Sequence, residues 1–349
     1  MVNVAIVGLG RQGMLHLMNC MNIPGVKVVA AADASKKYIQ KAKQLGIENV
    51  YSDYNDLFNH TSKIDAAVLS LPNFLHFDSI KLALENGINV FAEKPLARTT
   101  QECNEIIRLT EKSGKKLMVG HVMRFVDAIE TMKKKLDEGL IGNLEVATIE
   151  EIVNGPFAHP RNPAPVSDWW FDPSKSGGGC LLDIGYHMID LYHYFAGESD
   201  VDYTHLDHHF HLPVDDGATV LLHSSNSSSR GIVNVGWYQQ TVFPKYNFRV
   251  LLHGSAGYLS SDDFSPRSLY SYAAKEALKN VARRISGRKV HYLSYTYFYE
   301  SFYRELEHFV DCIKNDTVPS VTAEDGLRAV KTIEKAYENY RKNELRSCN

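Results

Sequence analysis

The chain has 349 residues, 44% of them hydrophobic, and carries a formal net charge of −3 at pH 7. This length allows two domain cores, while the lack of a basic excess argues against a nucleic-acid partner, and the lack of a leader or long apolar run argues against a membrane span. Five scattered cysteines without CxxC spacing indicate reduced thiols in a cytoplasmic protein.

The N-terminal residues follow a strand, turn, helix and strand pattern. An apolar run, Val4 to Val7, leads directly into the sequence Gly-Leu-Gly-Arg-Gln-Gly at residues 8–13, and an amphipathic helix pattern follows. The next apolar run, Val26 to Ala32, ends at the acidic residue Asp33. This order of elements is typical of a βαβ unit that binds a dinucleotide.

The glycine turn has a spacing that suits a pyrophosphate. Gly8 permits the tight turn, Gly10 lets the backbone approach the ligand, and Gly13 lets the helix pack closely on the strand. The start of the helix, at Arg11 and Gln12, offers unpaired N–H groups to the anion. We therefore expect these residues to bind the cofactor, in preference to a turn with only a structural role.

Asp33 bears on the choice between NAD and NADP. Its carboxylate can accept hydrogen bonds from both hydroxyls of an adenosine ribose and would repel a 2′-phosphate, which favours NAD. Ser35, Lys36 and Lys37 follow it, and a cation there could receive such a phosphate, so NADP is kept as an alternative. The other interpretation of the two lysines is the start of a solvated helix face.

Helix and strand patterns continue to alternate as far as Val119. The predicted helices span residues 36–45, 77–86 and 99–113, and the predicted strands span 65–69, 89–92 and 116–119. Alternation of this kind predicts a doubly wound parallel sheet with helices on both faces. Ligands of such sheets bind at the carboxyl ends of the strands.

Two of these strand ends carry polar residues. The strand at 65–69 is followed by Ser70, Leu71, Pro72, Asn73 and His76, and the strand at 89–92 is followed by Glu93, Lys94 and Pro95. Pro95 forces the chain to turn and holds Lys94 at the edge of the sheet. A solvated lysine is the alternative, but its place beside the cofactor crevice favours a functional role.

Beyond Gly120 the pattern changes. A helix is predicted at 126–138 and a strand at 144–153, followed by a Pro- and aromatic-rich loop at 154–176 that holds Trp169, Trp170 and Phe171. Loops this long inside a compact domain are usually functional. The loop ends in three glycines at 177–179, which allow close approach by a ligand or by another part of the chain.

A helix predicted from Leu181 carries the strongest catalytic candidates. Asp183 and His187 project from one face of it because they are four residues apart. A histidine beside a carboxylate is an oriented base whose pKa can lie near neutrality. The alternatives are a structural Asp-His pair and a metal site with Asp190 as third ligand, for which no separate motif is present.

Strand patterns dominate from Val201 onward. They span residues 201–212, 218–223, 231–238 and 248–253, with a polar hairpin turn at 224–229, and predict antiparallel pairing. The side chains of His205, Asp207, His209 and His211 alternate and would share one sheet face. We favour a polar surface or subunit interface there over a metal cluster.

The C-terminal part is predicted to be helical. A basic amphipathic segment, Ser268 to Lys289, is followed by helices at 302–314 and 323–342. A solvated helix is the default interpretation of the basic segment. Contact with a phosphorylated substrate or with an acidic membrane surface is the alternative.

Taken together, these motifs make the chain resemble the Gfo/Idh/MocA family of nicotinamide-dependent oxidoreductases. The resemblance rests on the glycine fingerprint, Pro72-Asn73 with His76, Glu93-Lys94-Pro95 and the GGGxLxDxGxH pattern at 177–187. It implies a Rossmann domain at 1–122 and an α/β domain at 123–349. That second domain would carry a large, mainly antiparallel open-faced sheet that forms homodimers or homotetramers, with C-terminal helices that can pack back on the Rossmann domain.

The resemblance also assigns roles to site residues. Lys94, Asp183 and His187 occupy the family's catalytic positions. His187 would take the proton of a substrate hydroxyl as hydride moves to the nicotinamide C4, Asp183 would bind a hydroxyl and orient the imidazole, and Lys94 would hydrogen-bond the reacting oxygen. The remaining candidates for the substrate pocket are Met123 and Arg124, which match a family segment, and Trp170 and Tyr238, on weaker grounds.

The expected activity is NAD(P)-dependent oxidation of a secondary hydroxyl on a cyclic polyol, sugar or nucleotide sugar. One alternative is redox-neutral glycosidase chemistry with tightly held NAD. The other is a regulator that senses a sugar or NAD without catalysis, which the complete Lys-Asp-His set disfavours.

Overall fold

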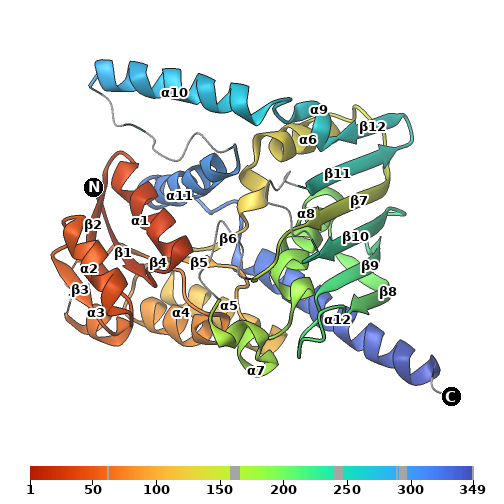
Figure 1. Cartoon of the computed structure of the whole chain (residues 1–349), viewed down its shortest axis with the longest axis horizontal. Coiled ribbons are helices and arrows are strands. Elements are labelled where there is room, and N and C mark those ends of the chain that lie inside the picture. The colour runs from red at the N-terminus through yellow and green to blue at the C-terminus, as the bar shows by residue number, and fades with distance from the viewer. Residues whose placement is uncertain (61–62, 158–165, 239–246, 288–289, 291–296, 348–349) are drawn as a thin grey trace.

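The computed structural model describes residues 1–60, 63–157, 166–238, 247–287, 290 and 297–347. It contains two six-stranded sheets, each accompanied by its own helices (Figure 1). The strands of the first sheet come from the N-terminal part of the chain, and the second sheet, formed by later residues, lies beside it. No described helix is long and apolar enough to cross a membrane.

The N-terminal sheet is parallel, with strand order β3-β2-β1-β4-β5-β6. Its strands are β1 (Val2–Val7), β2 (Val26–Ala32), β3 (Asn49–Tyr51), β4 (Ala66–Leu69), β5 (Asn89–Glu93) and β6 (Leu117–Gly120). Its helices are α1 (Arg11–Asn22), α2 (Lys36–Gln44), α3 (Tyr54–His60), α4 (His76–Glu85) and α5 (Thr100–Ser113). The predicted doubly wound fold is confirmed, and β3 and α3 are additional elements that were not predicted.

Burial explains why these segments form central strands. The residues of β4 are all buried, and so are those of β1 apart from the half-buried Asn3, because helices cover both faces of the sheet. The strand order reverses between β1 and β4, so the turns that follow these two strands diverge and leave a crevice. The glycine turn and Ser70 lie at that point.

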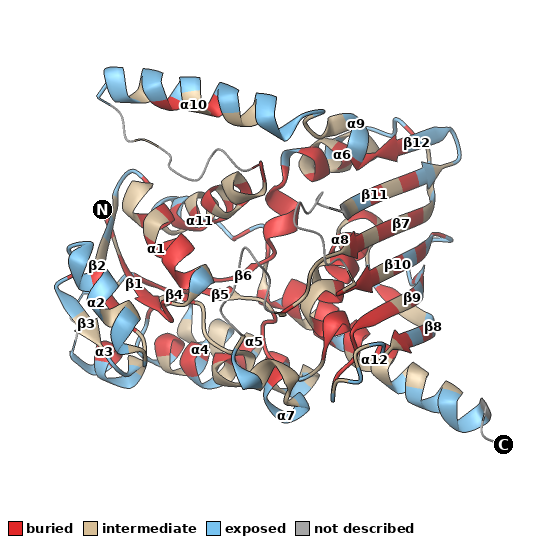
Figure 2. Ribbon diagram, viewed as in Figure 1, coloured by how far each residue is buried: buried red, intermediate tan, exposed pale blue. Residues whose placement is uncertain are grey.

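The C-terminal sheet has the order β12-β11-β7-β10-β9-β8. Its strands are β7 (Leu144–Ile152), β8 (Ser199–Asp207), β9 (Gly217–Ser224), β10 (Arg230–Gly236), β11 (Asn247–Gly254) and β12 (Gly257–Ser260). All neighbouring pairs are antiparallel except β7 and β10, which are parallel. Burial alternates along β9 and β10, so one face is packed and the other is open, which confirms the expected open-faced sheet (Figure 2).

The C-terminal helices connect the two halves. α11 (Tyr297–Asn315) packs against α1 and β5, and α12 (Ala323–Ser347) packs against α5, α8 (Tyr186–Ala196) and β8. Polar contacts reinforce this packing, since the Glu334 carboxylate accepts a hydrogen bond from the Thr100 N–H at 2.9 Å. The remaining described helices of this half are α6 (Asp127–Asp137), α7 (Pro173–Ser176), α9 (Ser261–Phe264) and α10 (Leu269–Ile285).

The histidine pattern predicted on one sheet face is wrong in part, because β8 ends at Asp207. The chain turns there: the Asp216 N–H donates to the Asp207 carbonyl at 2.9 Å, and the Asp216 carboxylate accepts from the Phe210 N–H at 2.6 Å. His209 and His211 therefore lie beyond the strand. In the predicted loop at 154–176, residues 158–165 lie outside the described part of the chain.

Candidate active site

The glycine turn between β1 and α1 has the steric properties that its spacing predicts. A Cβ on Gly8, whose φ is +83°, would lie 2.3 Å from the Ser70 carbonyl oxygen, and a Cβ on Gly13 would lie 1.8 Å from the Gly8 oxygen. A Cβ on Gly10 would meet nothing within 4 Å. Two of the glycines thus close the turn, while the middle one faces open space at the start of a helix, where a pyrophosphate can fit.

A pair of alanine variants tests this division of roles. Gly13→Ala is expected to lower the free energy of unfolding by about 1–3 kcal/mol, because the turn must shift to admit the methyl group. Gly10→Ala is expected to keep the wild-type stability and to weaken NAD binding. Urea denaturation and NAD titration by intrinsic fluorescence measure the two effects, and wild-type NAD affinity in Gly10→Ala would contradict the assignment.

Asp33 lies next to the same turn. Its Oδ2 accepts a hydrogen bond from the Leu9 N–H at 2.6 Å, and its Oδ1 accepts one from the Ser35 N–H at 2.7 Å. The carboxylate is half-buried, and each oxygen retains a lone pair for a ligand. Asp33 therefore fixes the glycine turn, and its predicted contact with a ribose remains a prediction.

Of the residues that follow β4, Ser70 is available to a ligand, whereas Asn73 and His76 hold other parts of the chain in place. The Ser70 hydroxyl is buried with no hydrogen-bond partner among the described residues, so it is available to a ligand. The Asn73 amide donates to the Ser176 carbonyl at 2.7 Å and joins the two halves. The His76 ring lies between the carbonyls of Pro95 and Leu71, at 2.6 and 2.8 Å, and burial lowers its pKa. His76 thus braces the loops that follow β4 and β5.

Lys94 and Asp183 form the polar centre of the site. Lys94 follows β5, precedes a cis peptide bond to Pro95, and donates to the Asp183 Oδ1 at 2.7 Å and to the Asp183 carbonyl at 2.9 Å. Both side chains keep some solvent access, at 17% and 18% exposure. The pair brings together a cation from one half of the chain and a carboxylate from the other, at the edge of the crevice.

The segment that carries Asp183 begins as one π-helical turn, Leu181–Gly185, and continues as α8. It is held by Asp215, whose carboxylate accepts hydrogen bonds from the N–H groups of Gly179 and Leu181 at 3.0 and 2.7 Å and from the Tyr337 hydroxyl at 2.7 Å. A Cβ on Gly179 would lie 2.0 Å from the Asp215 carbonyl oxygen. The glycines at 177–179 therefore allow another part of the chain, at Asp215, to approach closely. Asp215, which lies two residues before the start of β9, was not predicted as a functional residue.

His187 lies on α8 in a state suited to accepting a proton. Burial, then the neighbouring charge of Lys94 and His121, holds the pKa of its imidazole well below 6.5, so the ring is neutral at physiological pH. Its Nδ1 has no hydrogen-bond partner among the described residues. Among the described residues the Asp183 carboxylate accepts from Lys94 and not from this ring, so the expected orientation of the imidazole by Asp183 gains no support from the described contacts.

A buried charge network lies behind His187. Asp190 accepts two hydrogen bonds from Arg124, at 2.9 and 2.5 Å, and its Oδ1 lies 2.6 Å from the His121 Nδ1. Burial alone would raise the pKa of Asp190, but Arg124 and His121 outweigh it and hold this pKa well below its usual range. Arg124 also donates to Asp325 at 3.1 Å. Arg124 was predicted to contact the substrate, but its guanidinium group donates to the carboxylates of Asp190 and Asp325. Asp190 was considered as a metal ligand, but its carboxylate accepts from Arg124.

The other predicted pocket residues are placed as follows. Met123 is buried in the 3-10 turn Val122–Phe125. Trp170 is half-buried, with its ring centre 5.1 Å from that of Trp169. The Tyr238 hydroxyl donates to the Asp207 Oδ2 at 2.5 Å. None of these contacts tests substrate binding, so these assignments remain predictions.

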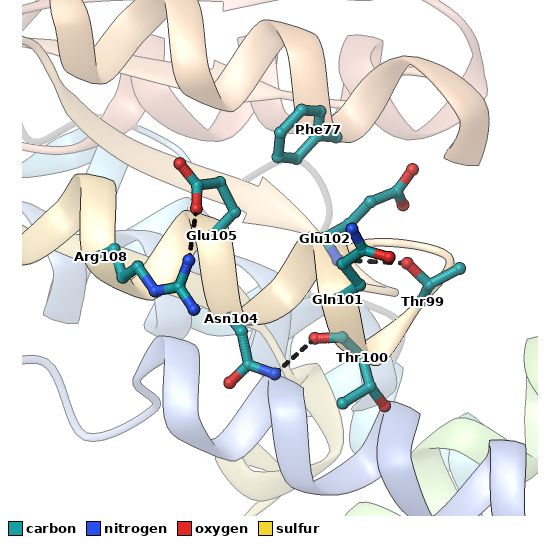
Figure 3. Close-up of a pocket in the computed structure, with 8 residues that line it drawn as sticks. All are labelled: Phe77, Thr99, Thr100, Gln101, Glu102, Asn104, Glu105 and Arg108. Atoms are coloured by element: carbon teal, nitrogen blue, oxygen red, sulfur yellow. Dashed lines mark hydrogen bonds and ion pairs between the residues drawn. The ribbon is translucent and has the colours of Figure 1, made fainter.

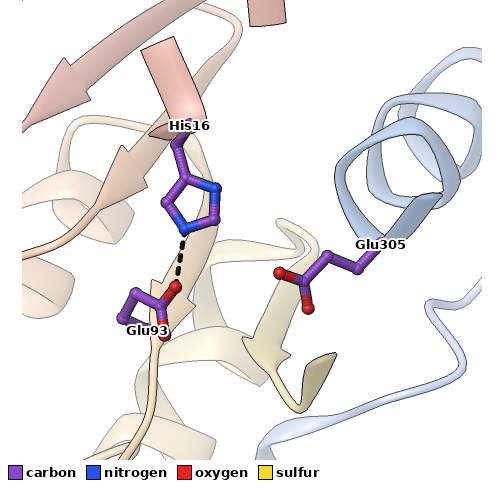
Figure 4. A group of neighbouring side chains, drawn as sticks. All are labelled: His16, Glu93 and Glu305. Carbon is purple, nitrogen blue, oxygen red and sulfur yellow. Dashed lines mark hydrogen bonds and ion pairs between the residues drawn. The ribbon is translucent and has the colours of Figure 1, made fainter. Parts of the chain in front are cut away.

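Glu93 belongs to a second buried cluster, with His16 from α1 and Glu305 from α11 (Figure 4). The His16 Nε2 lies 2.6 Å from the Glu93 Oε1, which is a hydrogen-bonding distance. Both oxygens of Glu305 are buried without a partner among the described residues, and burial, then Glu93, raises the pKa of this carboxyl well above its usual value. Because Glu93 Oε2 also accepts from the Lys94 N–H at 3.3 Å, the cluster fixes the segment that carries Lys94.

A surface hollow between α4 and α5 lies outside this site (Figure 3). It is lined by Phe77 and by residues of the 99–108 segment. Its polar groups bind one another: Thr99 accepts from the Glu102 N–H, and Arg108 pairs with Glu105 at 3.0 Å. With its charges already satisfied, this hollow offers no chemistry comparable to that of Lys94 and His187.

Comparison with known proteins is consistent with this geometry. Residues 2–121 match the model of an oxidoreductase family with an NAD-binding Rossmann fold, and residues 133–345 match the C-terminal alpha/beta domain of the same family. The chain is 26% identical over 333 residues to the scyllo-inositol 2-dehydrogenase (NAD(+)) of Bacillus subtilis, covering 92% of this chain and 89% of that protein.

Two further relatives extend the comparison. The 2,7-anhydro-N-acetylneuraminate hydratase of Mediterraneibacter gnavus is 31% identical over 196 residues, which cover 56% of this chain and 50% of that protein. The scyllo-inositol dehydrogenase of Lactobacillus casei, crystallised with NAD(H) and scyllo-inositol, superposes with a TM-score of 0.79 at 24% identity over 98% of each chain. At that identity the superposition supports the fold.

Proposed function

The chain belongs to the Gfo/Idh/MocA oxidoreductase family, and from this membership we propose that it is a dehydrogenase that oxidises a secondary hydroxyl of a cyclic polyol, sugar or nucleotide sugar with NAD. The observation that carries the proposal is the pairing of Lys94 with Asp183 at 2.7 Å, close enough to the neutral His187 for the Lys94 charge to lower the pKa of its imidazole. Three relatives that each cover more than 90% of the chain are named as inositol dehydrogenases.

The residues present fit a dinucleotide. The open space at Gly10, the start of α1 and the Ser70 hydroxyl, which has no partner among the described residues, would hold its phosphates and nearby groups, and Asp33 would bind the ribose. When bound, the cofactor supplies a hydride acceptor. This division leaves the protein side chains with the tasks of binding the substrate and moving its proton.

Each member of the Lys-Asp-His set has a task that its contacts support. His187 accepts the proton of the reacting hydroxyl, because its imidazole is neutral and its Nδ1 is unpaired among the described residues. Lys94 donates a hydrogen bond to the reacting oxygen and stabilises negative charge that develops there. Asp183 holds Lys94 in place and has a carboxylate that can accept a neighbouring substrate hydroxyl.

Asp33 should set the cofactor preference. We expect the wild-type protein to have a higher kcat/KM with NAD than with NADP, because the carboxylate would repel a 2′-phosphate. Asp33→Ser should narrow this preference by roughly tenfold or more, corresponding to about 1–3 kcal/mol for a close charge pair. Steady-state kinetics with both cofactors measure the ratio, Lys43→Ser serves as an exposed control, and an unchanged ratio in Asp33→Ser would contradict the role.

The proposal is tested by reduction of NAD and NADP, followed by nicotinamide absorbance, across inositols, free sugars, sugar acids and UDP-sugars. Turnover of a cyclic polyol or sugar, with regioselective oxidation of one secondary hydroxyl, supports it. Absence of turnover with the whole panel, with NAD still binding, would contradict net dehydrogenation. That outcome would favour redox-neutral chemistry, for which the 31% identity to a hydratase over half the chain is the supporting observation.

We also propose assembly through the open face of the C-terminal sheet. Tyr203, Leu221 and Ile232 are cross-strand neighbours on β8, β9 and β10, and are exposed by 45%, 37% and 37%. Three apolar side chains in a row on a sheet face are suited to an interface between copies. Leu221→Lys should shift the mass measured by light scattering to that of a monomer.

The buried free thiols Cys20, Cys103, Cys180 and Cys312 fit the proposed cytoplasmic location.

A further inference from the structure

α10 presents an unusual surface, because its apolar residues face water. Tyr270, Leu278, Val281 and Ile285 are exposed by 85%, 72%, 56% and 82%. With Ala274, which is also exposed, they recur every three or four residues and form one continuous line along the helix, here called the outer stripe. Figure 2 shows α10 at the margin of the molecule with most of its surface exposed.

The opposite face of α10, which lies against the protein, is the polar one. Glu276 and Asn280 are buried there, and Arg283 donates to the Asn280 Oδ1 at 2.9 Å. Tyr272 packs edge-on against Tyr297 of α11, with ring centres 5.5 Å apart. A surface helix normally buries its apolar face and exposes its polar one. The reversed arrangement means that the outer stripe is not used in packing against the described residues of this chain.

The charged residues beside the outer stripe indicate which kind of partner can bind to it. Lys275, Lys279 and Arg284 are exposed beside it, while Glu276, the only acidic residue of α10, is buried and paired with Lys279 at 2.5 Å. An antiparallel copy of α10 would bring these cations against cations. An anionic lipid surface complements both features, since its headgroups attract Lys and Arg and its acyl boundary accepts Tyr, Leu, Val and Ile.

We propose that α10 docks this protein on an anionic lipid bilayer as a peripheral helix. The outer stripe lies in the boundary between headgroups and acyl chains, and Lys275 and Arg284 contact the lipid phosphates. The polar face of α10 stays on the protein, so docking requires no unfolding. This inference concerns a surface formed by α10 and does not depend on the substrate or on the reaction.

Vesicle flotation of the full-length protein tests the proposal. We expect binding to vesicles of phosphatidylcholine mixed with phosphatidylglycerol, little binding to phosphatidylcholine alone, and release by added salt. The double variant Lys275→Gln/Arg284→Gln should lower the partition coefficient about 30-fold, at about fivefold per cation. The double variant Leu278→Ser/Ile285→Ser should lower it by at least as much, because it removes the apolar contact.

Matched controls separate this effect from general changes in surface. Tyr258→Ser, at an exposed residue of β12, and Lys134→Gln, at an exposed residue of α6, should bind vesicles as the wild type does. Unchanged thermal unfolding and NAD affinity show that the α10 variants are folded. A Leu278→Trp variant gives an independent signal, since its fluorescence should shift to shorter wavelength only with anionic vesicles.

Three outcomes would overturn the proposal. The first is failure of the wild-type protein to bind anionic vesicles at low salt. The second is vesicle binding that the stripe and cation variants leave unchanged. The third is a change of solution mass in Leu278→Ser/Ile285→Ser without any vesicle binding, which would assign the outer stripe to a second copy of the chain.

Discussion

His187→Asn is expected to lower kcat for substrate oxidation by about 10²–10⁴-fold, the usual contribution of a positioned general base. The imidazole is neutral because burial and the charges of Lys94 and His121 lower its pKa, and asparagine cannot accept the proton. NAD affinity should be unchanged, since the predicted cofactor contacts lie on the glycine turn and Asp33. Steady-state turnover and NAD titration measure both quantities.

The pH dependence gives this prediction a direction. A base must be unprotonated to act, so the rate falls only as pH drops through the pKa of His187. Because that pKa is held well below 6.5, kcat/KM in the wild type should stay level as pH is lowered to about 6.5 and fall at more acidic pH. His205→Asn, which changes an exposed histidine of β8, should leave the rate unchanged. Wild-type turnover in His187→Asn would contradict the assignment.

Arg124→Met is expected to lower the free energy of unfolding by about 3–5 kcal/mol, the usual cost of removing one partner from a buried ion pair. Arg124 and Asp190 are both buried, and the substitution leaves Asp190 and Asp325 without their common cation. Urea denaturation at neutral pH measures the loss.

Lys133→Met is the matched control for that variant. Like Arg124, Lys133 lies above the Tyr194 ring, but it pairs with Asp137 at the surface of α6, so its removal should cost at most about 0.5 kcal/mol. A similar small loss in Arg124→Met would show that the buried network contributes little to stability. A loss of turnover without a loss of stability would instead support the prediction that Arg124 contacts the substrate.

Local sequence patterns were sufficient for the cofactor half of the protein. A parallel strand that is buried on both faces appears in the sequence as an apolar run. The need for glycine at position 13 arises within the βαβ unit, because a Cβ there would lie 1.8 Å from the Gly8 oxygen, whereas a Cβ on Gly8 would meet Ser70, just after β4. The position of Lys94 follows from the same logic, because it comes directly after a buried strand. β3 has three residues and was missed since so short a strand has no pattern of its own.

The partners of these residues were decided by the tertiary structure. Asp183 meets Lys94 from the other half of the chain, Arg124 is joined to Asp190 and Asp325, and Asp215 holds the glycine run before α8. The sequence separations are long, and nothing in local spacing tells a carboxylate that binds substrate from one that neutralises a buried cation. The orientation of α10 is a second example.

The sequence of α10 showed an amphipathic basic helix, whose apolar face is normally buried. Packing decides which face is covered, and here Glu276 and Asn280 lie against the protein while Leu278 and Ile285 face outward. The sequence by itself therefore determined the fold class and the glycine turn, and it led to the prediction of the Lys-Asp-His set. Only the tertiary structure decided which charges neutralise one another and which surface is left for a partner, because both depend on contacts between distant segments.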